Sequence, residues 1–240
     1  MYDLDSNAIL SVALPDRRGS SMKNAWLKIF SQFTANGYRP KLHILDNECS
    51  GDIKRSFAKN HVDFQRVPTH LHRRNAAERA IQTWKHHFIA GLASSDPSFP
   101  LNAWDYLLPK YDLTLNHLRS SRQQPRLSAH ACPFGNFHFN RTLLAVPRTK
   151  VMIHDNPSQL SAFAPHGIDG FYVGPSLEHY RCYKVFVTAT QTTRNSVTME
   201  WFPSTIPYPK LTQDEYIRQT ADNLLSVLSN KTQPQVYPSL

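Results

Sequence analysis

The pattern of hydrophobic and polar positions predicts alternating strands and helices in the first half of the chain. Residues 7–14, NAILSVAL, form a short apolar run typical of a buried strand. From Ser21 onward apolar residues recur at helical spacing, and Gly37 stands where a helix C-cap glycine is expected. The run KLHILD, residues 41–46, predicts a second strand that ends at Asp46.

The same alternation continues to about residue 119. A short helix is expected over residues 51–60, a strand over VDFQRV at 62–67, and a longer helix from Asn75 to about Gly91. A further helix places its apolar residues on one side: Trp104, Leu107, Leu108, Tyr111, Leu115 and Leu118. Residues 1–119 are therefore predicted to form one mixed α/β domain.

The pattern changes in the second half of the chain. Residues 120–149 are basic and punctuated by proline, which is typical of a connector. Residues 150–203 contain short runs of aromatic and β-branched residues spaced by turn signals, which predicts a small β-barrel-like or sandwich domain. Residues 204–240 are expected to form a tail with one helix, roughly Gln213 to Ser229.

The composition of the chain indicates that its partner is acidic. The 240 residues carry a net charge of +9, which favours a polyanionic partner such as nucleic acid. No apolar run approaches the length of a membrane span, and the N-terminus lacks the features of a signal peptide. The odd number of cysteines, three, favours a reducing compartment over a disulfide framework.

Glu78 is the single acid within the most basic stretch of the chain, residues 72–88. One interpretation is structural, because Asn75 and Glu78 have the spacing of a helix N-cap and its capping-box acid. The other is functional, because Glu78 would approach Asp46 if this helix packs beside the end of the 41–46 strand. Asp46 likewise has a structural alternative, a strand-ending turn with Asn47. Two such carboxylates suit Mg²⁺, or Mn²⁺, which also takes phosphate oxygens as ligands.

Several segments resemble the integrase core of Ty1/copia-like retrotransposon polyproteins. RRNAAER, residues 73–79, resembles the NGxxER block that opens the catalytic helix of integrases, and HILDNECS, residues 43–50, resembles their SDNGxEF block. The N-terminal MYDLDSNAILSVAL is similar to the second strand of that domain. LSAHACPFGNFHFN and the later APHGIDGFYVGPSLEHYRCYKVF resemble the segments that follow the core.

The resemblance implies an RNase H-like α/β fold, with a mixed sheet, flanking helices and a small β unit after it. It implies two metal ions held by an Asp-Asp-Glu triad that drive 3′-end processing and strand transfer during DNA integration. Asp46 matches the second acid and Glu78 the third, and Lys85 matches a position that contacts the element's DNA end. Arg74 and Arg79 are expected phosphate contacts, and Arg119, Arg122 and Arg126 in the connector are expected to follow the DNA backbone.

The sequence departs from that pattern at its beginning. In the family the first acid lies on the strand before the one that residues 1–14 resemble, and this sequence has no counterpart of that strand. Asp3 and Asp5 are interpreted as part of a turn between strands, so we expect little or no strand transfer by this chain alone. An in-frame Asp-bearing strand upstream of Met1 would instead indicate an active enzyme. The alternatives are a non-catalytic, transposon-derived nucleic-acid-binding protein and a decayed reading frame.

The resemblance also bears on partners and location. It implies element and target DNA as partners, assembly into homo-oligomers and a nuclear or nucleoprotein-particle location. Outside the proposed site, Trp84 and Phe88 are expected in the core, and His86 and His87 on a solvated helix face.

Overall fold

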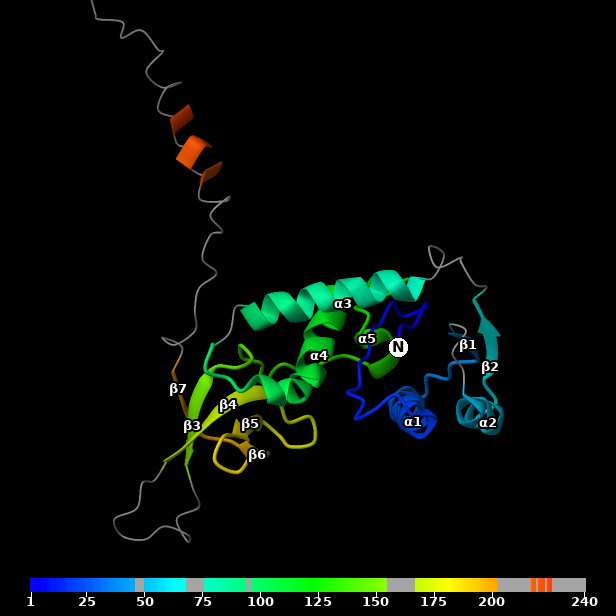
Figure 1. The fold of residues 1–240 in the computed structure, drawn as a ribbon, viewed down its shortest axis with the longest axis horizontal. Helices are drawn as coiled ribbons and strands as arrows, with labels where there is room; N and C mark the ends of the chain where they lie inside the picture. The colour runs from blue at the N-terminus through cyan, green and yellow to red at the C-terminus, as the bar shows by residue number, and fades with distance from the viewer. Residues whose placement is uncertain are drawn as a thin grey trace, which may run out of the picture. The chain divides into compact units, whose positions relative to one another are not determined.

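The computed structural model describes residues 1–45, 50–67, 76–93, 96–154 and 167–202, together with 217, 218, 220–222, 224 and 225. The chain divides into two compact units, Met1–Ile206 and Pro207–Leu240. The larger unit is a mixed α/β structure with a two-stranded parallel sheet, a five-stranded antiparallel sheet and helices (Figure 1). The described residues of the smaller unit are helical, in agreement with the single tail helix expected from the sequence.

Helices α1 (Gly19–Ala35) and α2 (Gly51–Lys59) form where the sequence predicts helices, and they pack together. Gly37 has a φ of +79°, which fits its predicted place just after α1. At the other end of α1, a Cβ on Gly19 would lie 2.9 Å from the Ser50 Oγ atom, so glycine allows the two helix starts to approach. Their shared core contains Trp26, Ile53, Phe57 and Val62.

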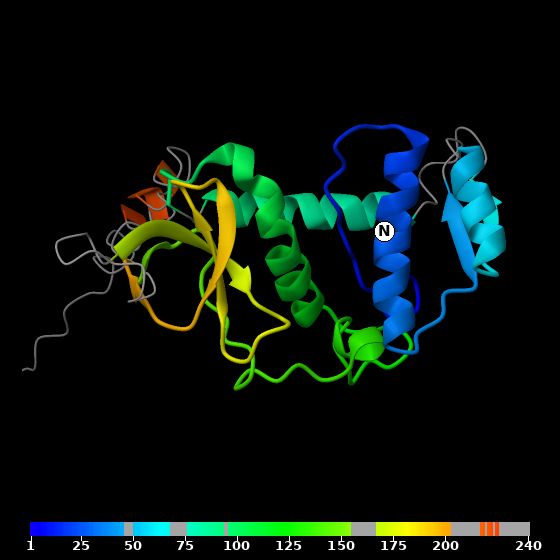
Figure 2. The same ribbon diagram turned by 90° about the horizontal axis from the view of Figure 1, so that it is seen from below.

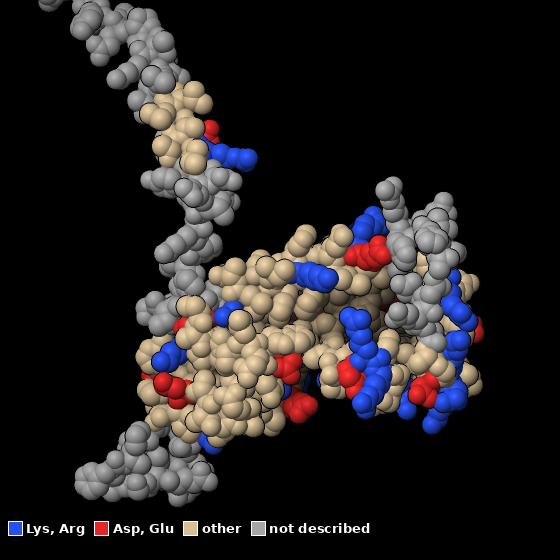
Figure 3. Space-filling view, viewed as in Figure 1, with Lys and Arg blue, Asp and Glu red and all other residues tan. Residues whose placement is uncertain are grey.

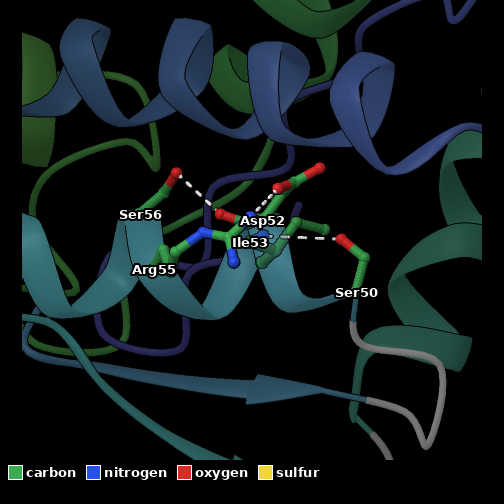
Figure 4. Close-up of polar contacts among 5 residues, drawn as sticks. All are labelled: Ser50, Asp52, Ile53, Arg55 and Ser56. Carbon is green, nitrogen blue, oxygen red and sulfur yellow. Dashed lines mark hydrogen bonds and ion pairs between the residues drawn. The ribbon is translucent and has the colours of Figure 1, made fainter.

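Polar contacts fix the first turn of α2 (Figure 4). The Ser50 hydroxyl caps the helix by accepting from the Ile53 N–H at 3.4 Å. Asp52 pairs with Arg55 one turn later, and the Ser56 hydroxyl donates to the Asp52 carbonyl at 3.0 Å. The helix therefore starts at Gly51, where the sequence pattern places its beginning.

Strands β1 (Leu42–Leu45) and β2 (Asp63–Arg66) form a parallel pair. The other predicted strand, residues 7–14, is wrong as a regular strand. Ala8, Ile9 and Leu10 are buried as predicted, but the segment forms only an isolated bridge between Ile9 and Tyr2. Side chains of a neighbouring helix, rather than a strand, satisfy much of its backbone.

That neighbouring helix is α4 (Leu108–Leu118), which follows the 3₁₀ helix η2 (Leu101–Leu107). The Asn116 side chain accepts from the Ile9 N–H at 2.8 Å and donates to the Ile9 carbonyl at 2.7 Å. One carboxylate oxygen of Asp112 accepts from the Ser11 N–H at 2.7 Å, and the other accepts from the Trp84 indole at 2.6 Å. Two helical side chains thus replace a strand partner, which explains why a strand-like sequence is not in a sheet.

Helix α3 (Ala76–Ala93) packs on α4, and both contribute to the largest core cluster (Figure 1). Phe88 is buried and Trp84 packs against the same cluster, which confirms their predicted core positions. The predicted apolar side of the 104–118 helix is correct except at its ends. Trp104 is 43% exposed and Leu118 is 80% exposed.

The second half of the large unit is an antiparallel sheet with strand order β6-β5-β4-β3-β7. Figure 2 draws its strands in yellow-green to orange. Its strands are β3 (Lys150–His154), β4 (Gly167–Pro175), β5 (Tyr183–Val187), β6 (Thr192–Ser196) and β7 (Met199–Trp201). The prediction of short strands over 150–203 is confirmed. The barrel-like form is wrong among the described strands, because β6 and β7 are separate edges.

The sheet and the helices share a core rather than standing apart. Phe171, Val173 and Phe186 from β4 and β5 pack with residues of α3, η2 and α4. The connector, which includes the short helix α5 (Ala131–Phe134), contributes Arg148, which is only 3% exposed and donates to the carbonyls of Leu92 and Asp96 at 2.6 and 2.9 Å. In the described part of the chain, no helix has the length and hydropathy needed to span a membrane.

Candidate nucleic-acid interface

A cavity of about 910 Å³ lies where both sheet strands of the N-terminal region, the chain start and the beginning of α3 come together. We call it the β1 cavity. Its lining includes Met1 to Asp5, Leu42 to Ile44 of β1, Gln65 to Val67 at the end of β2, and Ala76 and Ala77 of α3. Residues of the start of α3 and of the strand pair thus line the same cavity, which is the condition under which Glu78 would approach the end of β1.

Two open backbone edges line this cavity. The Asp63 and Val67 N–H groups donate to the carbonyls of Lys41 and Leu45. The backbone N–H and C=O groups of the odd-numbered residues of β1 therefore point toward β2. Since backbone groups alternate in direction along a strand, the N–H and C=O of Leu42 and Ile44 point to the other edge. No described strand pairs with that edge, and both side chains are 47% exposed.

The chain start presents the second edge. Met1 and Leu10 exchange two backbone hydrogen bonds, and the Asp3 N–H donates to the Ala8 carbonyl. Tyr2 lies between these two bonded pairs, opposite Ile9, so its own N–H and C=O point away from the Ile9 segment.

The predicted turn at Asp3 is confirmed. One carboxylate oxygen of Asp3 accepts from the Ser6 N–H at 2.8 Å, the Ser6 hydroxyl at 2.5 Å and the Tyr38 hydroxyl at 2.9 Å. Burial, followed by the hydrogen bond to Asp3, raises the pKa of the Tyr38 phenol far above its usual range. Asp3 is thus engaged in holding the turn and α1 together.

The two predicted metal ligands have different outcomes. Glu78 is exposed in the first turn of α3, next to the cavity-lining Ala77. Asp46 lies outside the described residues, one position beyond the end of β1. The residues that the structure describes contain no cluster of three or more His, Cys, Asp or Glu side chains suited to a metal ion. The metal pair therefore stays a prediction.

Three exposed cations that the sequence analysis missed line the β1 cavity: Arg39, Lys41 and Arg66. Arg39 and Lys41 precede β1, and the parallel register pairs Arg66 with Leu45. The sequence shows a cation at the boundary of each strand. It does not show the parallel register that brings these cations to one cavity. In Figure 3 the Lys and Arg side chains are conspicuous over α1 and α2.

The predicted DNA-contact residues fall into three groups. Arg79 and Lys85 on α3 are exposed, as are Arg122 and Arg126 in the connector. The Arg122 guanidinium lies 5.6 Å from the ring centroid of Tyr2, a residue that lines the β1 cavity. Arg74 lies outside the described residues.

Arg119, the third case, is partly engaged within the fold. Its guanidinium donates to the Asn7 backbone carbonyl at 3.1 Å and to the Asn7 side-chain oxygen. These bonds join the end of α4 to the chain start, so Arg119 has a role in the fold, and its contact with a DNA backbone stays a prediction.

The helix-face prediction for α3 is half right. His86 is exposed as expected, whereas His87 contacts the Thr114 hydroxyl at 3.1 Å and lies edge-on to the Tyr111 ring. Burial lowers the pKa of His87, which favours its neutral form in the folded protein.

Comparisons with known proteins return a structural likeness alone. No protein-family model and no curated protein matches the sequence. A solved structure described as the simian T-cell lymphotropic virus intasome in complex with PP2A regulatory subunit B56 gamma contains a similar chain. The identity is 14% and the TM-score 0.45, over 88% of this chain and 71% of that one.

Proposed function

We propose that this chain binds DNA through the β1 cavity and the adjoining face of α3. The observation that carries the proposal is the gathering of exposed Arg39, Lys41 and Arg66 at a cavity that also contains the start of α3. Arg79 and Lys85 extend the positive charge along the helix. Cations spread over a cavity and an adjacent helix suit a polyanion that follows a surface, because each phosphate contact releases a condensed counterion.

The resemblance of the Asp46 and Glu78 blocks to integrases makes the proposal more specific. In this proposal the two carboxylates are the remaining ligands of an RNase H-like integrase core of the Ty1/copia type. Carboxylate oxygens fit Mg²⁺ or Mn²⁺, and such an ion would polarise a phosphodiester held by the neighbouring cations. Asp3 offers no substitute for the first acid, since its carboxylate is taken by Ser6 and Tyr38.

A gel-retardation experiment tests DNA binding. We expect the purified chain to retard a 20-base-pair duplex at low salt. Replacing Arg39, Lys41 and Arg66 together with Gln should weaken binding by roughly tenfold or more and reduce the salt dependence by about two to three phosphate contacts. The matched control replaces Arg141, Lys150 and Arg181 with Gln, which removes the same charges elsewhere. Equal losses for the two triple variants would overturn the assignment to the β1 cavity.

A nicking assay tests the chemistry separately. Since the Asp3 carboxylate is engaged by Ser6 and Tyr38, we expect no nicking of duplex DNA by this chain in Mg²⁺ or Mn²⁺. Robust nicking that Glu78→Gln abolishes, with DNA retardation unchanged, would show a complete metal site and contradict the expected inactivity.

The second candidate function is binding without chemistry, as in a transposon-derived nucleic-acid-binding protein. The engagement of Asp3 favours it, because a two-carboxylate site lacks a bridging ligand for a metal pair. DNA retardation that is the same with EDTA and with Mg²⁺, and is unaffected by Asp46→Asn or Glu78→Gln, would support this candidate over the integrase-type site.

A further inference from the structure

Lys110 is a buried cation in α4. Only 3% of its surface is exposed, and within the described residues its ammonium has no hydrogen-bond or ion-pair partner. Desolvation lowers the pKa of Lys110 to about 8. Its nitrogen is not among the fully buried polar atoms that lack a partner in the described residues, so the ammonium keeps some contact with solvent while the rest of the side chain is covered. A cation that is largely removed from water without a counterion is costly, and natural proteins normally pair such groups.

A separate cavity of about 380 Å³, which we call the Lys110 cavity, lies beside this residue. Its volume falls in the range of roughly 300–1,000 Å³ that is typical of small-ligand sites. Residues of the chain start, α1, η2, α4 and the five-stranded sheet line it, and none of them lines the β1 cavity. The two cavities are therefore independent features.

Positive charge dominates the lining of the Lys110 cavity. Lys28 from α1 and Lys184 from β5 join Lys110, while Asp105 is the one carboxylate among the lining residues. Thr193 adds a hydroxyl from β6. Three cations against one carboxylate leave a site that favours an anion with several acceptor oxygens.

The backbone beside Lys110 leaves room for its side chain. A Cβ placed on Gly174 of β4 would lie 3.3 Å from the Lys110 Cβ, closer than almost all natural contacts of this kind. Glycine at position 174 therefore allows α4 and β4 to approach closely at Lys110.

We propose that the Lys110 cavity binds a phosphate group, with Lys110 as its buried counterion and Lys28 and Lys184 closing over it from α1 and β5. The phosphate comes either from a small phosphorylated ligand or from a nucleic-acid backbone. A dianion supplies the missing partner of Lys110 and stabilises its charged form.

Thermal unfolding of the full chain in inorganic phosphate tests the site, with chloride at equal ionic strength as the reference. Saturating phosphate should raise the Tm of the wild type by about 2–8 °C. Lys110→Met should abolish this difference, while the exposed control Lys59→Met should keep it. Without phosphate, Lys110→Met should be at least as stable as the wild type, because the buried charge is gone.

Two results would overturn the proposal: no phosphate-specific shift in the wild type, or the same shift in Lys110→Met. Should Lys110→Met fail to fold, phosphorus-31 line broadening gives the same decision with Lys28→Gln/Lys184→Gln. We expect this double variant to bind phosphate at least fivefold more weakly, and unchanged binding would refute the site.

Retardation of the 20-base-pair duplex distinguishes the two sources of phosphate. If the group belongs to DNA, Lys110→Met lowers duplex affinity and reduces the salt slope by about one contact. If duplex binding is unchanged while phosphate binding is lost, the ligand is a small phosphorylated molecule. Failure of DNA binding through the β1 cavity leaves the phosphate measurement unaffected, so the two proposals are tested separately.

Discussion

The two sheets of the large unit bury their strands to different extents. In the five-stranded sheet Val151, Tyr172, Val185 and Val187 are fully buried, and they form a core cluster of their own. The β1–β2 pair is two strands wide, and Leu42 and Ile44 remain 47% exposed at its open edge. Since two strands alone are marginally stable in water, the β1–β2 pair depends on helices α1 and α2, whose core Leu45 and Phe64 join. The extended segment at residues 9–11 depends instead on the side chains of Asp112 and Asn116.

The largest effect is expected at Asn116, whose side chain satisfies both backbone groups of Ile9 and is 1% exposed. Asn116→Leu should lower the free energy of unfolding by about 2–5 kcal/mol, because two buried backbone groups lose their partners. Asn195→Leu on the exposed face of β6 is the control, with a change within about 0.5 kcal/mol. Urea denaturation measures both, and equal small effects would argue against a side-chain clamp.

A smaller effect is expected from adding one methyl group to each region. A Cβ on Gly170 in β4 would lie 2.6 Å from the Val185 Cγ1 atom and 2.7 Å from the Phe186 carbonyl oxygen. Gly170→Ala should therefore cost about 1–3 kcal/mol. Gly51→Ala in α2 should be neutral or stabilising, because the nearest atom would be 3.9 Å away. Tolerance at Gly170 would show that the second sheet is less tightly packed than described.

Acid should destabilise the fold through two histidines. Burial lowers the pKa of His43 and of His130 to about 4, so the stability that they contribute is present above about pH 6.5 and lost as pH falls to about 4. Asp112 acts in the opposite direction, because burial raises its pKa to about 6 and its protonated form is favoured in the fold. Because two histidines oppose one aspartate, we expect the free energy of unfolding to decrease on acidification.

His130→Phe separates these contributions, since phenylalanine keeps the packing of His130 on His117 and Phe134. Between pH 7 and 4 this variant should lose about 1–2 kcal/mol less stability than the wild type. Chemical denaturation at several pH values measures the difference. If both proteins show the same pH dependence, the pKa of His130 does not differ between the folded and the unfolded state.

The smallest effect is expected at the open edge of β1. Ile44→Thr should change stability by less than about 0.5 kcal/mol, whereas Val185→Thr in the buried sheet should cost roughly 1–3 kcal/mol. Thermal unfolding compares the two variants. A loss at Ile44 as large as that at Val185 would mean that the edge is covered in solution.

Local patterns predicted the elements whose stability is local. The helical spacing before Gly37, the short helical run at residues 51–60 and the β-branched runs after residue 150 each produced the expected element. Residues 7–14 failed because their backbone partners, Asp112 and Asn116, lie more than a hundred positions away. A polar residue on a helix carries no signal in the sequence that it will bond an extended segment.

The candidate site shows the same limit. The sequence proposed Arg79, Lys85 and Arg122 as DNA contacts on the same footing as Arg119, and only the structure shows that Arg119 bonds Asn7. The sequence analysis missed Arg39, Lys41 and Arg66, which meet only through the parallel register of β1 and β2. No sequence motif predicts the burial of Lys110, because an isolated lysine in a helix ordinarily faces solvent.

The open edge of β1 has a consequence for handling the protein. Within the described residues no strand pairs with the outward N–H and C=O groups of Leu42 and Ile44, whose side chains are exposed. Such an edge is a template on which an extended segment of another molecule can add as a further strand. The five-stranded sheet presents polar Thr192, Arg194 and Ser196 along its β6 edge, which discourages such addition. Self-association in concentrated solution is therefore expected to begin at residues 42–45, and a lysine in place of Ile44 should suppress it.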